Sequence, residues 1–141
     1  MSIENNKATV TAFVHAISEQ EWATLDALVA DDVVRRSRTY GLPELRGRKQ
    51  LVEFLKSEVM TFPDAYQKIL YLVAEEDRVA AALQFTGTQK GPMGPFPASG
   101  RRIHANFLAM FRLKEGRIAE VWVEWDNLSA LLQLGHLTLP S

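Results

Sequence analysis

Hydrophobic positions in the first half of the chain repeat at the spacing of amphipathic helices. The clearest set falls at i, i+3, i+4 and i+7 and consists of Val10, Phe13, Val14 and Ile17. The same spacing predicts a shorter helix over 22–29 and a third over 51–59, which begins after Gly47. Val33 and Val34 predict a short strand between these two helices, and residues 40–43 predict a loop.

The second half of the chain has the composition of β-strands. Four segments are rich in β-branched and aromatic residues: 66–74, 79–88, 102–113 and 117–125. Short polar turns at 75–77 and 114–116 join them into two hairpins. Three glycines and three prolines mark residues 89–100 as a loop, and a short amphipathic helix over 127–134 ends at Gly135.

Helices followed by paired strands indicate an α+β fold. We expect three N-terminal helices packed on a strongly curved, mixed but mostly antiparallel sheet, with a short C-terminal helix. The 141 residues suffice for one domain, so residues 1–141 are assigned to a single unit. A sheet curved in this way would form a cone with a central pocket, which is the default ligand site.

Charge and composition remove several function classes. The 16 basic and 17 acidic residues nearly balance, which argues against nucleic acid as a partner. The absence of cysteine excludes thiolate chemistry, and the three histidines form no spaced set with carboxylates, so we predict no metal. The N-terminus lacks a hydrophobic leader, and the longest apolar run, 69–74, is too short for a bilayer. We therefore expect a cytoplasmic protein with no membrane partner.

Asp126 is the first candidate for catalysis because it ends an aromatic strand. Desolvation among apolar rings favours the protonated form of a carboxyl group, which suits general acid–base chemistry. Asp126 also stands at the N-cap position of the following helix, with Ser129 three residues on. Both roles remain open, and they can coexist only if one carboxylate oxygen stays free.

Alternation along the last strand predicts a polar face around Asp126. Side chains two residues apart share a face, so this face would line a polar cavity or meet solvent. His104 lies on the neighbouring strand and is the second candidate acid or base, although an exposed, hydrogen-bonded histidine is the alternative. Five arginines between 35 and 48 form either a cradle for an anionic group or a solvated edge. The candidate substrate contacts are Glu120, Trp122, Glu124, Asn106, Tyr40 and Arg36.

An ordered set of short segments resembles one family. The set includes Leu45-Arg46-Gly47-Arg48, Phe62-Pro63-Asp64, Thr86-Gly87-Thr88, Gly100-Arg101-Arg102, Glu120-Val121-Trp122 and Trp125-Asp126-Asn127. Over residues 7–135 this order is similar to the SnoaL-like polyketide cyclases of the nuclear-transport-factor-2-like superfamily. The resemblance implies an α+β barrel with a cone-shaped pocket and a homodimer formed through the outer face of the sheet.

The resemblance also implies a chemistry. Family members bind aromatic polyketide methyl esters and close a ring by intramolecular aldol condensation without a cofactor, and Asp126 matches their acid–base aspartate. We therefore expect a small apolar or aromatic metabolite as the partner of this chain. At three positions where relatives often carry histidine, this chain has other residues. The positions lie within Arg35-Arg36-Ser37, Thr88-Gln89 and Glu120-Val121-Trp122. The alternatives are therefore a non-catalytic small-molecule binding protein, another lyase, isomerase or epoxide hydrolase activity of this cone, or an interaction protein that uses only its sheet face.

Overall fold

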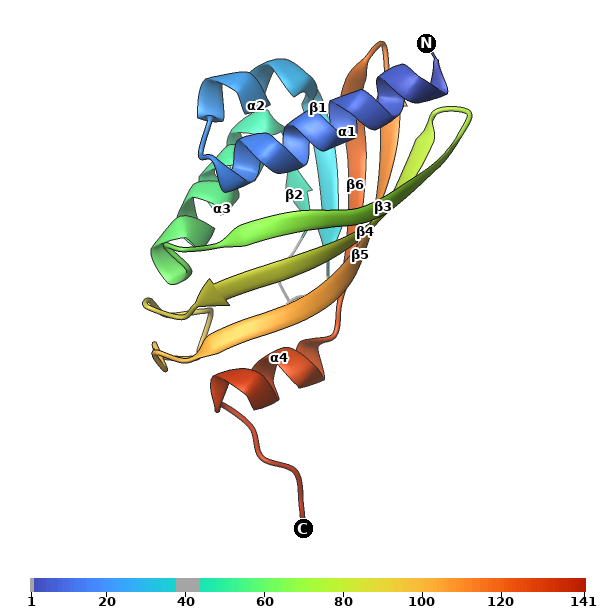
Figure 1. Ribbon diagram of the computed structural model, residues 1–141. Helices are drawn as coiled ribbons and strands as arrows, with labels where there is room; N and C mark the ends of the chain where they lie inside the picture. The colour runs from blue at the N-terminus through green and yellow to red at the C-terminus, as the bar shows by residue number, and fades with distance from the viewer. Residues whose placement is uncertain (1, 38–43) are drawn as a thin grey trace.

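The computed structural model describes residues 2–37 and 44–141 (Figure 1). Its elements, in chain order, are α1 Ile3–Ser18, α2 Trp22–Leu28, β1 Val29–Ser37, β2 Leu45–Arg46, α3 Arg48–Thr61, β3 Tyr66–Glu75, β4 Arg78–Thr88, β5 Arg102–Lys114, β6 Arg117–Trp125 and α4 Asn127–Leu134. The α+β fold class is confirmed, and both predicted hairpins form. Tyr40, a predicted substrate contact, lies outside the described residues.

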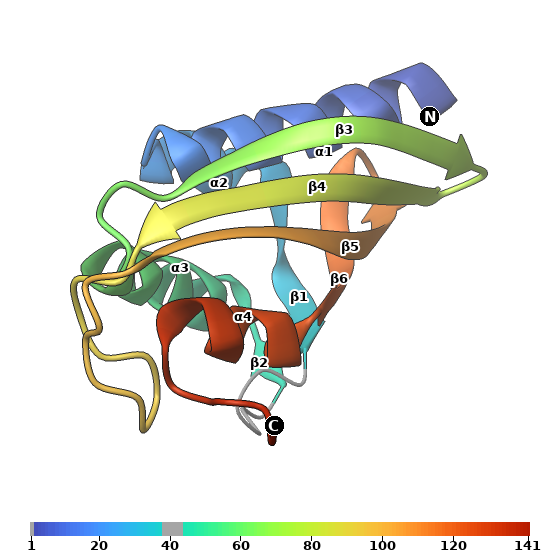
Figure 2. The ribbon, with the colours of Figure 1, turned by 60° about the horizontal axis from the view of Figure 1, so that its bottom comes forward.

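One curved sheet organises the molecule. Its strand order is β2-β1-β6-β5-β4-β3, and β1 runs parallel to β6 while the other neighbours are antiparallel. The long strands β3, β4 and β5 bend over the helices (Figure 2). The expectation of a barrel is wrong, because β2 and β3 are open edges of the sheet. A two-residue strand such as β2 cannot continue the hydrogen-bonding ladder around to β3.

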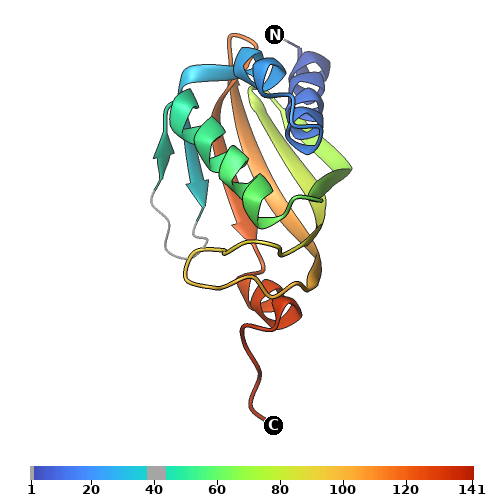
Figure 3. The same cartoon turned by 90° about the vertical axis from the view of Figure 1, so that its left-hand side faces the viewer.

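The core lies between the inner face of the sheet and the helices α1 to α3. Along β5 every second residue is buried, which follows from the alternation of side chains across a strand. Val10 and Phe13 bring the apolar face of α1 into this core, and the Phe13 ring meets Phe111 edge-on at 5.8 Å. Helix α4 lies apart from helices α1 to α3 and contacts the beginning of β5 (Figure 3).

Strand β1 is longer than the sequence indicated and has an irregular register. It pairs with β6 as Val29↔Ile118 and then Val34↔Glu120, with a shift between these two positions. After the shift, alternation is regular, so Arg35 lies on the inner face and Arg36 on the outer face. This register decides which arginine of the sequence cluster enters the interior.

The loop between β4 and β5 is held against the end of α3. The backbone N–H groups of Lys90 and Gly91 donate to the carbonyl of Thr61 at 2.8 and 3.2 Å. These bonds satisfy a carbonyl that the helix end leaves unpaired. The buried Gln89 side chain donates to the Gly91 and Pro97 carbonyls, both at 3.1 Å. These hydrogen bonds hold the loop in place beside the end of α3.

Candidate active site

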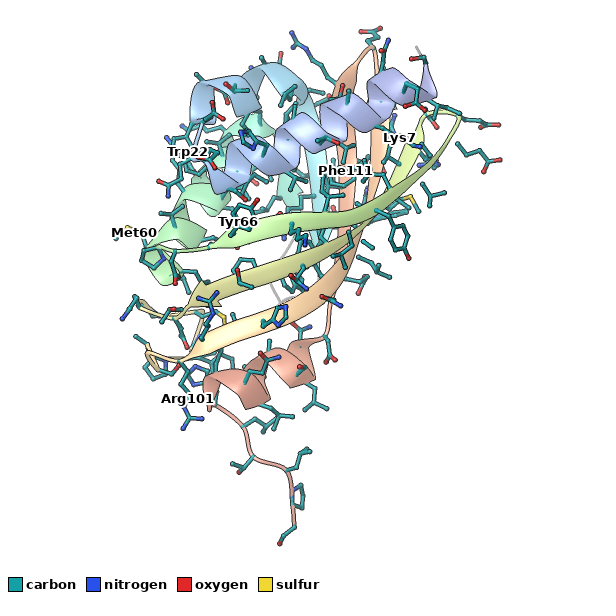
Figure 4. All side chains as sticks on the ribbon, viewed as in Figure 1. Lys7, Trp22, Met60, Tyr66, Arg101 and Phe111 are labelled. Atoms are coloured by element: carbon teal, nitrogen blue, oxygen red, sulfur yellow. The ribbon has the colours of Figure 1, made fainter. Side chains whose placement is uncertain are left out.

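A cavity of about 440 Å³ lies between α3, the loop after β4, the inner face of the sheet and α4. Its walls are mainly apolar: Phe54, Met60, Phe62, Phe85, Pro92, Met93, Ile103, Trp125 and Ala130. Figure 4 shows Met60 at the C-terminal end of α3, where the loop approaches the helix. A cavity of this size and character suits a small apolar molecule.

Aromatic rings that contact one another form one wall of the cavity. The Phe85 ring stands edge-on to Phe62 at 5.2 Å and to Trp125 at 5.5 Å, and Trp125 stacks on Phe107 at 4.0 Å. Edge-to-face and stacked arrangements are the ones that aromatic pairs prefer. Phe62, Phe85 and Trp125 of this set line the cavity and give it an aromatic wall.

Arg35 and Glu58 bring charge into this apolar cavity. Arg35 comes from β1 and exposes only 9% of its surface. Its guanidinium lies 4.5 Å from the centroid of the Phe54 ring, a cation–π contact. Glu58 comes from α3 and lies on the wall of the large cavity and of two smaller ones. Among the described residues, these two are the charged side chains that line the large cavity.

The sequence pattern of each element explains these positions. Val33 and Arg35 are two residues apart, so both point to the inner face of β1. Leu51, Leu55 and Glu58 are separated by four and then three residues, which places Glu58 on the buried face of α3. Glu58 was missed by the sequence reasoning, although a carboxyl at an apolar position of the helical repeat was a readable signal.

Burial perturbs the ionisation of both groups. It raises the pKa of the Glu58 carboxyl, and the positive charge of Arg35 offsets part of that rise. Burial likewise lowers the pKa of Arg35, while the nearby Glu58 charge acts in the opposite direction. The shift moves Glu58 toward the pH range in which a carboxyl can both accept and return a proton.

The sequence model of the SnoaL-like polyketide cyclases matches residues 7–134. The chain belongs to this family. No curated protein matches the chain in sequence. Among solved structures, TsrD from Streptomyces laurentii is 26% identical with a TM-score of 0.86, and covers 97% of this chain and 99% of its own. IdmH from Streptomyces antibioticus, a proposed polyketide cyclase, is 28% identical with a TM-score of 0.81, and covers 92% of this chain and 98% of its own.

The same fold occurs in an epoxide hydrolase. An LEH-like epoxide hydrolase from M. tuberculosis is 19% identical with a TM-score of 0.75, and covers 94% of this chain and 90% of its own. At this identity the likeness shows the fold alone.

Across residues 2–37 and 44–141, no group of three or more histidine and carboxylate side chains could hold a metal ion. None of the helices described is long and apolar enough to cross a membrane.

Asp126 of this SnoaL-like protein is the N-cap of α4. Its Oδ1 accepts a hydrogen bond from the backbone N–H of Ser129 at 3.0 Å, which confirms the capping interpretation. The side chain is exposed, and the cavity is lined instead by its neighbours Trp125 and Asn127. The catalytic role of Asp126 stays a prediction.

The other candidate residues are brought together on the outer face of the sheet. Glu120 accepts hydrogen bonds from Arg36 Nη1 at 3.0 Å and Arg112 Nε at 3.1 Å, and Arg36 also lies over the Trp122 ring at 5.3 Å. Partial burial would raise the pKa of Glu120, but Arg112 and Arg36 outweigh it and hold the pKa below its ordinary value. These residues face away from the helices, so none of them lines the cavity beside Arg35.

His104, Asn106 and Glu124 also lie on the outer face and are exposed. The backbone N–H of His104 donates to Gln133 Oε1 at 2.8 Å, which ties β5 to α4. Glu124 lines a shallow groove on the outer face. The predicted face around the last strand therefore exists, but it is the solvent side of the sheet. The substrate roles assigned to these residues stay predictions.

Proposed function

We propose that this protein is a cofactor-independent acid–base enzyme that acts on a small, mostly apolar carbonyl compound. The observation that carries the proposal is a carboxyl with a raised pKa, Glu58, beside the buried cation Arg35 in an otherwise apolar cavity. Membership of the SnoaL-like family supports ring closure by intramolecular aldol chemistry as the reaction class. The ligand body would lie on the aromatic wall formed by Phe62, Phe85 and Trp125.

The proposed chemistry needs one proton acceptor and one group that stabilises negative charge. Ionised Glu58 accepts a proton from the carbon next to a carbonyl, and the electron pair moves to the carbonyl oxygen. Arg35 stabilises the resulting enolate oxygen. The enolate carbon then attacks a second carbonyl of the same molecule and forms the new carbon–carbon bond. Glu58 returns its proton to the new alkoxide oxygen, so no other reactant is consumed.

Proton abstraction can be tested before the natural substrate is known. A panel of aromatic and aliphatic β-keto esters is incubated in D₂O, and loss of the hydrogen between the two carbonyl groups is followed by NMR. We expect the wild-type protein to accelerate exchange of at least one compound and Glu58→Gln to abolish the acceleration. Asp126→Asn is the matched carboxyl-to-amide control and should exchange as fast as wild type. Exchange that persists in Glu58→Gln and disappears in Asp126→Asn would assign the proton transfer to Asp126 instead.

A non-catalytic binding protein is the second candidate. It is favoured by Gln89, which stands where relatives often have histidine. Gln89 is fully buried, and its amide is engaged with the loop carbonyls and with His136 Nε2 at 2.7 Å. The residue therefore supports the wall and offers no free group to a ligand. Tight binding of the panel compounds without any accelerated exchange would favour this candidate.

We further propose that the outer face of the sheet pairs with a second copy of the chain. Large apolar side chains are exposed there on the three strands β3, β5 and β6: Tyr71, Val73, Leu108, Met110 and Trp122. They border the shallow groove that also contains Arg36 and Glu124. A two-fold axis through this groove would bury the apolar patch against itself and bring basic and acidic rims together. A homodimer is the arrangement that this composition favours.

A further inference from the structure

Arg35 is the one charged residue that is buried in the described part of the chain. A guanidinium has five N–H donors and no acceptor, and it keeps its charge in proteins. Removing such a group from water costs free energy unless acceptors inside the protein replace the lost hydration. The interior of the cavity should therefore supply acceptors for Arg35.

The described residues do not supply them. In that part of the chain, the Arg35 guanidinium forms no ion pair and no hydrogen bond. The Phe54 ring face covers one side at 4.5 Å, and Glu58 interacts only through its charge. Arg36 provides the contrast, since it pairs with Glu44 and Glu120, both at 3.0 Å. The adjacent, outward arginine is satisfied and the inward one is not.

We propose that Arg35 is an anion-binding subsite and that the cavity takes an aromatic or apolar compound bearing a carboxylate. A carboxylate fits the planar fork of a guanidinium with two parallel hydrogen bonds. A single cation in an apolar cavity neutralises one negative charge, which disfavours a phosphate dianion. The aromatic wall around Phe85 and Trp125 receives the rest of the molecule. The proposal rests on the proposed function, because the carboxylate would occupy the position beside Arg35 that the enolate oxygen takes in that reaction.

Glu58 makes binding sensitive to protons. A bound carboxylate and an ionised Glu58 would place two negative charges around one cation. The remaining elements around the cavity contribute lining side chains without charge: Met93 and Pro92 of the loop, Phe85 of β4, Ile103 of β5, Trp125 of β6 and Ala130 of α4. Binding of the anion should therefore favour protonation of Glu58 and take up a proton from solution. A carboxylate bound at Arg35 corresponds to the stage of the proposed reaction at which Glu58 holds the proton and Arg35 faces the enolate oxygen.

The test compares a naphthoate anion with its methyl ester by calorimetry at neutral pH. The two probes share the aromatic body and differ in charge. We expect wild type to bind the naphthoate about 10- to 100-fold more tightly than the ester, the range for a hydrogen bond to a charged group. Arg35→Met should lose this preference and still bind the ester. Arg46→Met is the control, since it removes an exposed charge of the same arginine cluster that does not line the cavity, and it should keep the preference.

Two further measurements locate the effect. Titrations in buffers of different ionisation enthalpy should show proton uptake with naphthoate in wild type and none in Glu58→Gln. Ala130→Trp should fill the cavity and block both probes, with circular dichroism confirming that the variant folds. Binding that survives Ala130→Trp would overturn the proposal.

The result also separates this proposal from the proposed function. Equal binding of the two probes, preference for the ester, or an unchanged preference in Arg35→Met overturns the anion subsite and leaves the carbonyl-binding cavity standing. If wild type binds neither probe, the subsite is overturned, and the proton-exchange assay on the β-keto esters decides the proposed function separately. A naphthoate preference that depends on Arg35 supports the subsite even where no β-keto ester exchanges its proton.

Discussion

Two substitutions of Asp126, to Ala and to Asn, separate a structural role of this residue from a catalytic one. Its Oδ1 accepts the backbone N–H of Ser129, and the side chain is exposed, so its contribution to stability should be that of an ordinary N-cap. Loss of such a cap costs about 1 kcal/mol, within a range of about 0.5–2 kcal/mol. Asn is an equally good N-cap residue, so Asp126→Ala should be destabilised and Asp126→Asn should not.

The expected change in melting temperature follows from the chain length. At about 2.1 cal/mol/K per residue, the unfolding entropy of 141 residues is about 0.3 kcal/mol/K. A loss of about 1 kcal/mol then lowers the Tm by about 3 °C, and the full range corresponds to about 2–7 °C. Thermal unfolding followed by circular dichroism resolves this difference. Glu53→Ala is the control, because it removes an exposed carboxylate that makes no cap and should change stability by less than about 0.5 kcal/mol.

Two outcomes would refute the reasoning. An unchanged Tm in Asp126→Ala would show that the cap contributes nothing to the folded state. A normal Tm in Asp126→Asn combined with loss of proton exchange on the β-keto ester panel would show that Asp126 is the acid or base. In that case the assignment to Glu58 would be wrong, because a carboxyl that only caps a helix can be replaced by an amide without chemical consequence.

Three further predictions concern the cavity, the loop and the outer face. Burial raises the pKa of Glu58 above its unfolded value, so wild type loses stability as pH rises through the unfolded value of about 4.3 toward the folded one. Urea denaturation should therefore show Glu58→Gln to be more stable than wild type at neutral pH. The difference in unfolding free energy should disappear below about pH 4, and a difference that does not depend on pH would contradict this prediction. In Gly91→Ala the new Cβ would lie 2.5 Å from the Met60 carbonyl oxygen, so the loop must move. We expect the free energy of unfolding, measured with denaturant, to fall by about 1–3 kcal/mol and naphthoate binding to weaken. Pro95→Ala changes an exposed residue of the same loop and should alter neither quantity. Leu108→Lys should convert a dimer to a folded monomer in sedimentation experiments, and a wild-type protein that already sediments as a monomer would refute the outer-face interface.

Local pattern was sufficient for most of the secondary structure. The hairpins over 66–88 and 102–125 carry their own turns and alternation, so neighbouring residues define them. Strand β2 was missed because two residues give no periodicity. Strand β1 was predicted too short because Asp31 and Asp32 interrupt its apolar pattern. Its partner β6 is far away in the sequence, and only the folded sheet provides that pairing.

The candidate site was harder to predict, because both faces of the sheet carry large apolar side chains. Trp122 and Trp125 are three residues apart in β6, so alternation places them on opposite faces. The sequence does not say which face meets the helices when the outer one also has exposed residues such as Leu108. The arginine cluster was recognised, yet Arg36 was chosen where the structure turns Arg35 inward. One register shift in β1 makes that difference.

The positions of Arg35 and Glu58 argue that the cavity is kept for a ligand. Each occupies a site that the pattern of its own element reserves for an apolar residue, the inner face of β1 and the buried face of α3. Replacing buried charges by apolar side chains of similar size is often neutral or stabilising, so packing alone gives no reason to retain them. The two residues come from elements that meet only in the folded protein, and each shifts the ionisation of the other. Two coupled charges that lower the stability of the folded protein and gather at one cavity are typical of a functional site. The double variant Arg35→Met with Glu58→Leu should accordingly unfold at least as high in temperature as wild type while losing the preference for an anion. A double variant that is destabilised and still selective would show that the two residues serve the fold.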